Sequence, residues 1–114
     1  MWEVITTDRF DTWYDALDEK DRTNVLAAML VLSDYGPRLS RPYADTVNGS
    51  SFPNMKELRV QSRGKPIRVF YAFDPQRCAI LLCGGNKSGA GNRFYREMIS
   101  MADHEYAEHL KTLT

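Results

Sequence analysis

Four basic residues in the second half of the chain have the types and spacing of a phosphate-binding groove. Arg59 and Arg68 lie in two successive segments that we expect to form paired strands, which could bring their guanidinium groups together. Lys87 follows in a turn, and Arg93 stands near the start of the last expected helix. Arginine offers a rigid fork of donors for phosphate oxygens. Singly, each arginine is explained better by a surface ion pair, such as Arg59 with Glu57, but together the four favour a groove that holds a phosphate chain.

A glycine-rich stretch, residues 84–92, joins the last expected strand to the last expected helix. It departs from the Walker pattern of nucleotide triphosphatases, because Asn86 rather than glycine precedes Lys87. We expect a flexible turn whose backbone amides, Lys87 and the following helix N-terminus could receive an anion. Arg93 and Arg96 stand in the first turn of that helix, where the helix dipole disfavours a cation and a bound phosphate would relieve the conflict. Considered by itself, the stretch 84–92 is slightly better explained as a solvated loop than as an anion-binding turn.

Three residues of the last helix could exchange protons during a reaction. Histidine titrates near neutral pH, which makes His104 a candidate acid or base. Tyr95 and Tyr106 have the spacing of core residues, although either could present its hydroxyl at the edge of a groove. His104 and His109 are five residues apart, whereas the zinc-binding metalloprotease helix needs a spacing of four. We therefore expect no metal site and no cofactor.

The composition indicates a single soluble domain that spans residues 1–114. The 15 Lys and Arg residues equal the 15 Asp and Glu residues, so a dispersed, charge-driven contact with nucleic acid is not expected, although a local basic patch is compatible with this balance. No signal peptide and no stretch of membrane-spanning length is recognisable, which predicts a cytoplasmic protein without a membrane partner. Cys78 and Cys83 lie five apart on one expected strand, so they should point to opposite faces as buried, reduced thiols.

The first half of the chain predicts a short strand and a pair of helices. The strand covers Trp2–Thr6 and is expected at a sheet edge, and the helices begin near Asp8 and near Asp21. They should form a hairpin that covers one side of a sheet, with Leu26 and Leu30 widening the apolar face of the second helix. The segment 37–53 is expected to be a surface loop without regular structure, because it lacks periodicity and is rich in Pro, Ser, Asn and Gly.

The second half predicts an antiparallel meander followed by a helix. The expected strands are Met55–Ser62, Ile67–Asp74 and Arg77–Cys83, joined by short turns, and the last of them should be central and covered on both faces. The last helix should run from about Arg93 to Leu113, capped by Asn92. The order β-α-α-β-β-β-α is that of an α+β domain with helices packed on a small antiparallel sheet.

These segments resemble the RelE/ParE toxin superfamily, and within it the HigB-like branch of type II toxin–antitoxin systems. The resemblance is carried by Glu57–Val60, Ile67–Tyr71, Ile80–Leu82 and Gly84–Lys87, and it extends over nearly the whole chain. It implies a RelE-like, microbial-ribonuclease-type fold with helices on one side of the sheet. It also implies a metal-independent endoribonuclease, an mRNA interferase that cuts messenger RNA on the ribosome and so inhibits translation.

The resemblance implies roles for the residues singled out above. Arg68 and Lys87 would polarise the scissile phosphate, while Arg59, Arg93 and Arg96 would bind RNA phosphates nearby. The RNA 2′-hydroxyl would be the attacking group, and electrostatic stabilisation of this kind is often the largest catalytic term. One of three residues would serve as the acid or base: Tyr95, His104 or Tyr106.

The same resemblance implies partners and leaves alternatives open. A cognate antitoxin, expected to be a HigA-like protein of the helix-turn-helix type, would neutralise the toxin, and operator DNA would be bound only by the pair. Messenger RNA and the ribosome would be the targets. The alternatives are a ParE-like inhibitor of DNA gyrase without nuclease chemistry, and a non-catalytic protein whose main partner is its antitoxin.

Overall fold

The fold is a five-stranded sheet with helices on both faces, as a computed structural model of the protein describes it for residues 1–89 and 91–114. The strands lie in the order β1-β5-β4-β3-β2. In chain order the elements are β1 (Val4–Thr6), α1 (Asp8–Asp15), α2 (Glu19–Tyr35), the 3-10 helix η1 (Gly36–Arg38), β2 (Ala44–Thr46), β3 (Lys56–Ser62), β4 (Lys65–Phe73), β5 (Ala79–Asn86) and α3 (Gly91–Lys111).

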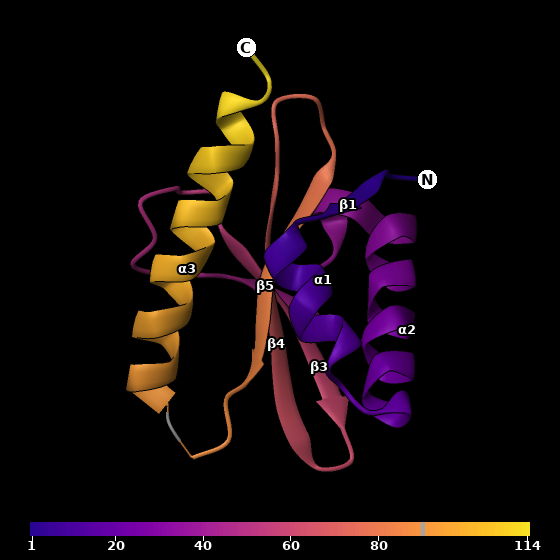
Figure 1. Ribbon diagram of the computed structural model, residues 1–114. Helices are drawn as coiled ribbons and strands as arrows, with labels where there is room; N and C mark the ends of the chain where they lie inside the picture. The colour runs from indigo at the N-terminus through magenta and orange to yellow at the C-terminus, as the bar shows by residue number, and fades with distance from the viewer. Residues whose placement is uncertain (90) are drawn as a thin grey trace.

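The sheet separates two apolar cores, as Figure 1 shows with α1 and α2 on one side of the strands and α3 on the other. Val69 and Tyr71 of β4 face the α1–α2 hairpin, and Phe70 and Ala72 face α3. A strand that is apolar on both faces must be covered on both, because exposed apolar area is unfavourable in water. The expected hairpin of helices over one face is confirmed. The expectation that all helices lie on one side of the sheet is wrong, because α3 covers the other face. Among the described residues no helix combines the length and apolar character that a membrane crossing needs.

Local signals set the helix ends. The Thr7 hydroxyl accepts a hydrogen bond from the Phe10 amide (3.1 Å) and caps α1, and Asp18 caps α2 in the same way. The second helix thus begins at Glu19, slightly before the expected start near Asp21. Gly36 ends it with a positive φ of 59°, a conformation that favours glycine.

The outward face of α2 differs from the expectation. Leu26 and Leu30 are 46% and 60% exposed instead of buried, and Tyr35 is 54% exposed on the same helix. The helix is apolar around most of its circumference but has neighbours on one side only, so Val25 and Leu32 take the buried positions.

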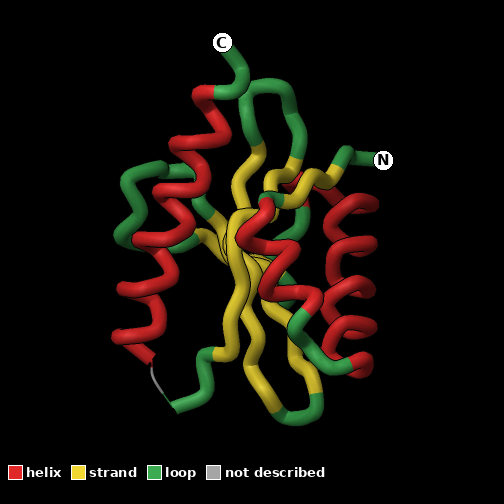
Figure 2. Tube along the Cα trace, viewed as in Figure 1, coloured by secondary structure: helices red, strands yellow, loops and turns green. Residues whose placement is uncertain are grey.

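The sheet edges also differ from the expectation. The segment 37–53 contains β2, which pairs with β3 and was not predicted because three residues are too few for an alternating pattern. The edge strand β1 pairs parallel with β5, while the other three pairings are antiparallel, and Figure 2 shows these strands between the helical layers. The central strand is therefore β4, and β5 is covered on both faces but lies second from the edge.

A bulge in β5 overturns the expectation for the two thiols. The register shifts opposite Phe70 and Tyr71, so that Leu82 is the extra residue between the partners of these two. One extra residue cancels one step of the alternation, which places both Cys78 and Cys83 in the core under α3. Both are buried free thiols, as expected. The strand continues to Asn86, through the first glycines of the expected turn.

The start of α3 differs in detail from the expectation. The helix begins at Gly91, so Asn92 lies inside its first turn and does not cap it. The residue before Gly91 lies outside the described residues.

Candidate functional site

Two arginines stand opposite each other on the face of the sheet that α3 covers. Arg59 of β3 and Arg68 of β4 are direct partners in the register of the two strands. Like charges directly opposite each other are unfavourable. The structure therefore needs a nearby anion to hold this pair together.

Glu57 supplies that anion, and its carboxylate is almost fully buried. It accepts a hydrogen bond from Arg59 Nε (3.0 Å) and one from the Tyr95 hydroxyl (2.6 Å), and it lies 3.8 Å from Arg68 Nε. Glu57 precedes Arg59 by two residues on the same strand and so shares its face. Together Glu57, Arg59, Arg68 and Tyr95, with Lys87 beside Tyr95, form what we call the arginine cluster.

Lys87 and Tyr95 bring the turn and the last helix to this cluster. The Lys87 amide donates to the Pro66 carbonyl (3.0 Å), which fixes the residue just beyond β5. Its ammonium group lies 5.5 Å from the centre of the Tyr95 ring, within the range of a cation–π contact. Burial, reinforced by the hydrogen bond to Glu57, raises the pKa of Tyr95 above its ordinary value, so this phenol keeps its proton at neutral pH.

The guanidinium group of Arg68 is not fully hydrogen-bonded among the described residues. Its side chain is 10% exposed, and one terminal nitrogen donates to the Ile67 carbonyl (3.1 Å). Its Nε has no hydrogen-bond partner among the described residues. Buried polar groups without partners are uncommon, and such a group at a surface hollow is suited to an anionic ligand.

Two hollows meet at Arg59. One, of about 370 Å³, lies over Arg59 and Arg68 and has the exposed ring of Tyr43 on its wall. The other, of about 290 Å³, is lined by Arg59, Glu57 and Tyr95 and reaches Asn92 at the start of α3. Two adjacent hollows that share a guanidinium group can accommodate consecutive phosphates of an extended chain.

The remaining candidates on α3 differ in their distance from the arginine cluster along the helix. Arg93 and Arg96 are exposed in its first turns, and Arg93 pairs with Glu97 (3.0 Å). His104 and Tyr106 follow Tyr95 by nine and eleven residues, which is about 14 and 17 Å along a helix that rises 1.5 Å per residue.

Neither far residue belongs to the arginine cluster. The Tyr106 hydroxyl donates to the Phe73 carbonyl (3.2 Å) inside the core, and His104 is exposed. The structure thus brings together Arg59, Arg68, Lys87 and Tyr95, with Arg93 and Arg96 near them on the same helix end.

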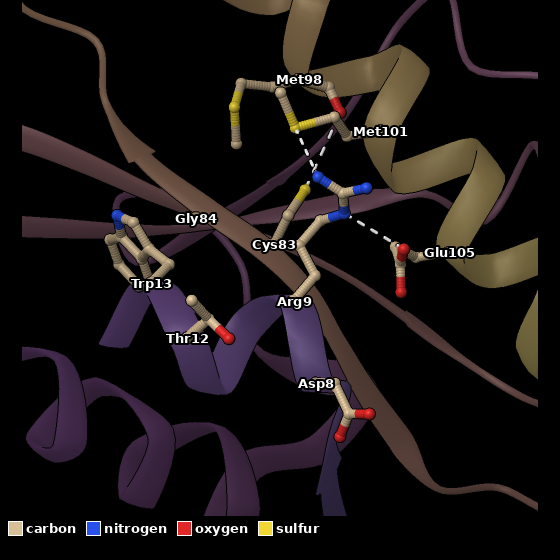
Figure 3. Close-up of a pocket in the computed structure, with 9 residues that line it drawn as sticks. All are labelled: Asp8, Arg9, Thr12, Trp13, Cys83, Gly84, Met98, Met101 and Glu105. Atoms are coloured by element: carbon tan, nitrogen blue, oxygen red, sulfur yellow. Dashed lines mark hydrogen bonds and ion pairs between the residues drawn. The ribbon is translucent and has the colours of Figure 1, made fainter. Parts of the chain in front are cut away.

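A larger hollow of about 700 Å³ lies elsewhere, between α1 and α3 at the edge of β5 (Figure 3). Arg9 reaches across it to Glu105 (3.1 Å), so its guanidinium group is already paired. Burial raises the pKa of Cys83 to about 12, which keeps this thiol protonated and unreactive. The arginine cluster, with its open donors, is therefore the better candidate site despite its smaller hollows.

The sequence predicted Glu57 as an ion-pair partner of Arg59 and as part of the segment that carries the family resemblance, but not as a residue of the site. Its position two residues before Arg59 was the available signal. The contact with Tyr95 joins residues 38 positions apart and needs the packing of α3 on the sheet. Within residues 1–89 and 91–114, His, Cys, Asp and Glu side chains form no group of three that could hold a metal ion.

Comparisons with known proteins agree with this architecture. The family described as Phage derived protein Gp49-like (DUF891) matches residues 12–107. The Mycobacterium tuberculosis (strain ATCC 25618 / H37Rv) protein named "Putative toxin HigB2" is 46% identical over 104 residues, and "Putative toxin HigB3" of the same organism is 45% identical over 100. These alignments cover 90% and 88% of this chain. They span about half (52%) of HigB2 and 86% of HigB3.

Solved structures share the fold at low sequence identity. A mutant of the E. coli toxin RelE in the free state has a TM-score of 0.65 at 14% identity and covers 89% of this chain and 93% of its own. The intact E. coli RelBE toxin–antitoxin complex contains a chain with a TM-score of 0.61 at 13% identity, which covers 75% of this chain and 95% of its own. The archaeal RelE–RelB complex from Pyrococcus horikoshii OT3 contains one with a TM-score of 0.56 at 15% identity, which covers 78% and 98%.

Proposed function

Because the chain belongs to the Gp49-like family and is a HigB-like member of the RelE/ParE toxin superfamily, we propose that it is a type II toxin that cleaves messenger RNA on the ribosome. The observation that carries the proposal is the arginine cluster. It joins paired arginines, a lysine and a tyrosine beside two hollows on one face of the sheet.

The cluster contains the groups that phosphoryl transfer from RNA requires. Arg68 and Lys87 would neutralise the charge that builds up on the scissile phosphate, and Arg59 would hold a neighbouring phosphate. Arg93 and Arg96 would extend the basic surface along the RNA. The 2′-hydroxyl of the ribose would attack the phosphorus atom, which restricts the reaction to RNA, and no metal ion is needed for this chemistry.

Tyr95 is the member of the three acid–base candidates that we assign to the site. Its hydroxyl lies in the cluster at 2.6 Å from Glu57, whereas the Tyr106 hydroxyl is bonded within the core. His104 lies too far along α3 to reach the same phosphate.

The proposal includes a neutralising partner. Structures of RelE with RelB describe toxin–antitoxin complexes, and by analogy this chain would bind a cognate antitoxin in the cytoplasm. We propose a HigA-like antitoxin of the helix-turn-helix type, with operator DNA bound only by the pair.

One observation favours a second candidate, a ParE-like inhibitor of DNA gyrase. Leu26 and Leu30 are exposed and four residues apart on α2, so they share one face and form an apolar patch suited to another protein. In that case α2 would contact the target, and the arginine cluster would be dispensable.

Induction without the antitoxin distinguishes the two candidates. The wild-type chain should stop protein synthesis and cut messages at ribosomes, while Arg68→Ala and Lys87→Ala do neither. The exposed Arg38, in the 3-10 turn after α2, supplies the matched control Arg38→Ala, which should act like the wild type. Arrest of DNA replication with intact messages would support the gyrase candidate instead. Absence of any growth defect, with the chain folded and expressed, would contradict both and leave a non-catalytic antitoxin-binding protein.

A further inference from the structure

We propose that Glu57 receives the proton that leaves the attacking 2′-hydroxyl, and that it does so through the hydroxyl of Tyr95. The inference rests on the proposed RNA cleavage and deepens it by assigning the proton pathway. Because Glu57 acts through Tyr95, it is a positioning residue and does not itself contact the RNA.

The geometry carries the inference. The Tyr95 hydroxyl donates to Glu57 Oε1 at 2.6 Å, a short distance typical of a hydrogen bond to an ionised acceptor. Glu57 is 4% exposed, while Tyr95 lines the hollow at the start of α3. The tyrosine therefore stands between the buried carboxylate and the space that an RNA would occupy.

Charged side chains from four segments lie around the Glu57 carboxylate and Tyr95. Arg59 binds Glu57 Oε2 from its own strand, and Arg68 approaches Oε1 from β4. Asp45 of β2 faces Glu57 in the register and is itself paired with Arg59 and Arg41. On the α3 side, Lys87 lies beside Tyr95. Three cations near the carboxylate and the phenol outweigh the single further anion, Asp45.

Tyr95 cannot by itself take the proton from the 2′-hydroxyl, because its oxygen already carries a proton. Its pKa is raised by burial and by the bond to Glu57, so a phenolate is not available near neutral pH. The Tyr95 oxygen can accept a proton only while its own proton moves to Glu57. The neutral phenol of Tyr95 is a poor base, but this transfer delivers the proton to the Glu57 carboxylate, which is a stronger one.

The step balances as follows. The O2′–H bond breaks, its proton goes to the Tyr95 oxygen, and the former tyrosine proton goes to Glu57 Oε1, which becomes a neutral carboxylic acid. The O2′–P bond forms as the P–O5′ bond breaks, and the electron pair of that bond stays on O5′. The Lys87 ammonium group donates a proton to O5′. The products are a 2′,3′-cyclic phosphate and a 5′-hydroxyl, and Glu57 and Lys87 return to their charges by exchange with water.

The test is single-turnover cleavage of ribosome-bound messenger RNA near neutral pH. Glu57→Gln should be slower than the wild type by about 100-fold or more, Glu57→Asp should recover part of the rate, and Tyr95→Phe should resemble Glu57→Gln. Binding of RNA with a 2′-deoxy scissile position should change only a few-fold. Glu108→Gln, an exposed glutamate at the far end of α3, is the control and should match the wild type.

Cleavage by Glu57→Gln at the wild-type rate would overturn the proton pathway. A measurement that does not depend on cleavage separates this failure from failure of the proposed function. Ultraviolet titration, with Tyr95→Phe used to identify the Tyr95 signal, should show Tyr95 ionising at lower pH in Glu57→Gln than in the wild type. Unchanged titration would show that the contact is absent and would overturn the inference. A wild type that cleaves no RNA would overturn the proposed function and the proton pathway together.

Discussion

Arg59 and Arg68 lie directly opposite each other on β3 and β4, and the carboxylate of Glu57 lies within ion-pair distance of both. Glu57 thus offsets the repulsion between the two guanidinium groups, and Asp45 adds a second ion pair to Arg59. This arrangement keeps two guanidinium groups close together on a surface that a phosphate chain can reach.

Removing that anion should cost stability. Glu57→Ala leaves two guanidinium groups facing each other, and loss of one partner of a buried pair typically lowers the free energy of unfolding by about 3–5 kcal/mol. Urea unfolding of Glu57→Ala, Arg68→Ala and the double variant measures the effect. The double variant should be destabilised by less than the sum of the single variants. Additive losses would show that Glu57 and Arg68 do not interact.

Lys87 should matter for activity but not for folding. Its side chain is partly exposed and its structural bond is made by the backbone amide, so Lys87→Ala should unfold at the wild-type temperature. Cleavage should fall by about 100- to 1,000-fold, as when one preorganised donor to a developing charge is removed. Lys87→Arg should retain part of the rate, and the neighbouring Ser88→Ala should be unaffected. Full activity in Lys87→Ala would exclude this lysine from the site.

The two tyrosines of α3 should separate activity from stability. Tyr106→Phe loses the bond to the Phe73 carbonyl, which should lower the free energy of unfolding by about 1 kcal/mol and leave cleavage intact. Tyr95→Phe should slow cleavage by about 100-fold or more, and His104→Ala should change neither property. Thermal unfolding and cleavage, measured on the same preparations, check this division. Loss of cleavage in Tyr106→Phe with a normal unfolding temperature would transfer the acid–base role to Tyr106.

Acid should weaken the attachment of α2 to the β3–β4 hairpin. Hydrogen bonds from Lys65 and Ser62, and the charge of Lys65, lower the pKa of Asp21 to about 2 from an ordinary value of 3.8. A carboxylate with a lowered pKa stabilises the fold above pH 3.8, and this contribution is lost as the pH falls towards 2. Urea unfolding between pH 6 and pH 2.5 should therefore show a weaker pH dependence for Asp21→Asn than for the wild type. Equal slopes would mean that Asp21 is not ion-paired in solution.

The approach of α1 to β5 should make Gly84 intolerant of a side chain. An added Cβ would lie 2.4 Å from the ring of Trp13, so Gly84→Ala must displace the indole and should cost about 1–3 kcal/mol. Gly91→Ala is the matched control, because nothing lies within 4 Å of its Cβ position and alanine favours the first turn of α3. The comparison uses thermal unfolding. Equal unfolding temperatures for the two variants would contradict the close packing of Trp13.

Local features of the fold could be predicted because they depend on near neighbours in the chain. The start of the first helix at Asp8 depends on a few consecutive residues and was predicted, whereas the Asp18 cap, which starts the second helix at Glu19 instead of near Asp21, was not. The alternation in β4 identified both of its faces for the same reason. The resemblance to HigB-like toxins, carried by short strand segments, is confirmed by the family match.

The sequence by itself therefore determined the helices, the three long strands, the family and the basic residues Arg59, Arg68 and Lys87 as candidates. Only the tertiary structure decided which side chains meet. It added β2, turned Leu26 and Leu30 outward, and placed Cys78 and Cys83 on one face through the bulge in β5. It also joined Glu57 to Tyr95 and separated both from Tyr106. Such contacts depend on how distant elements pack, and no periodicity within a single segment contains that information.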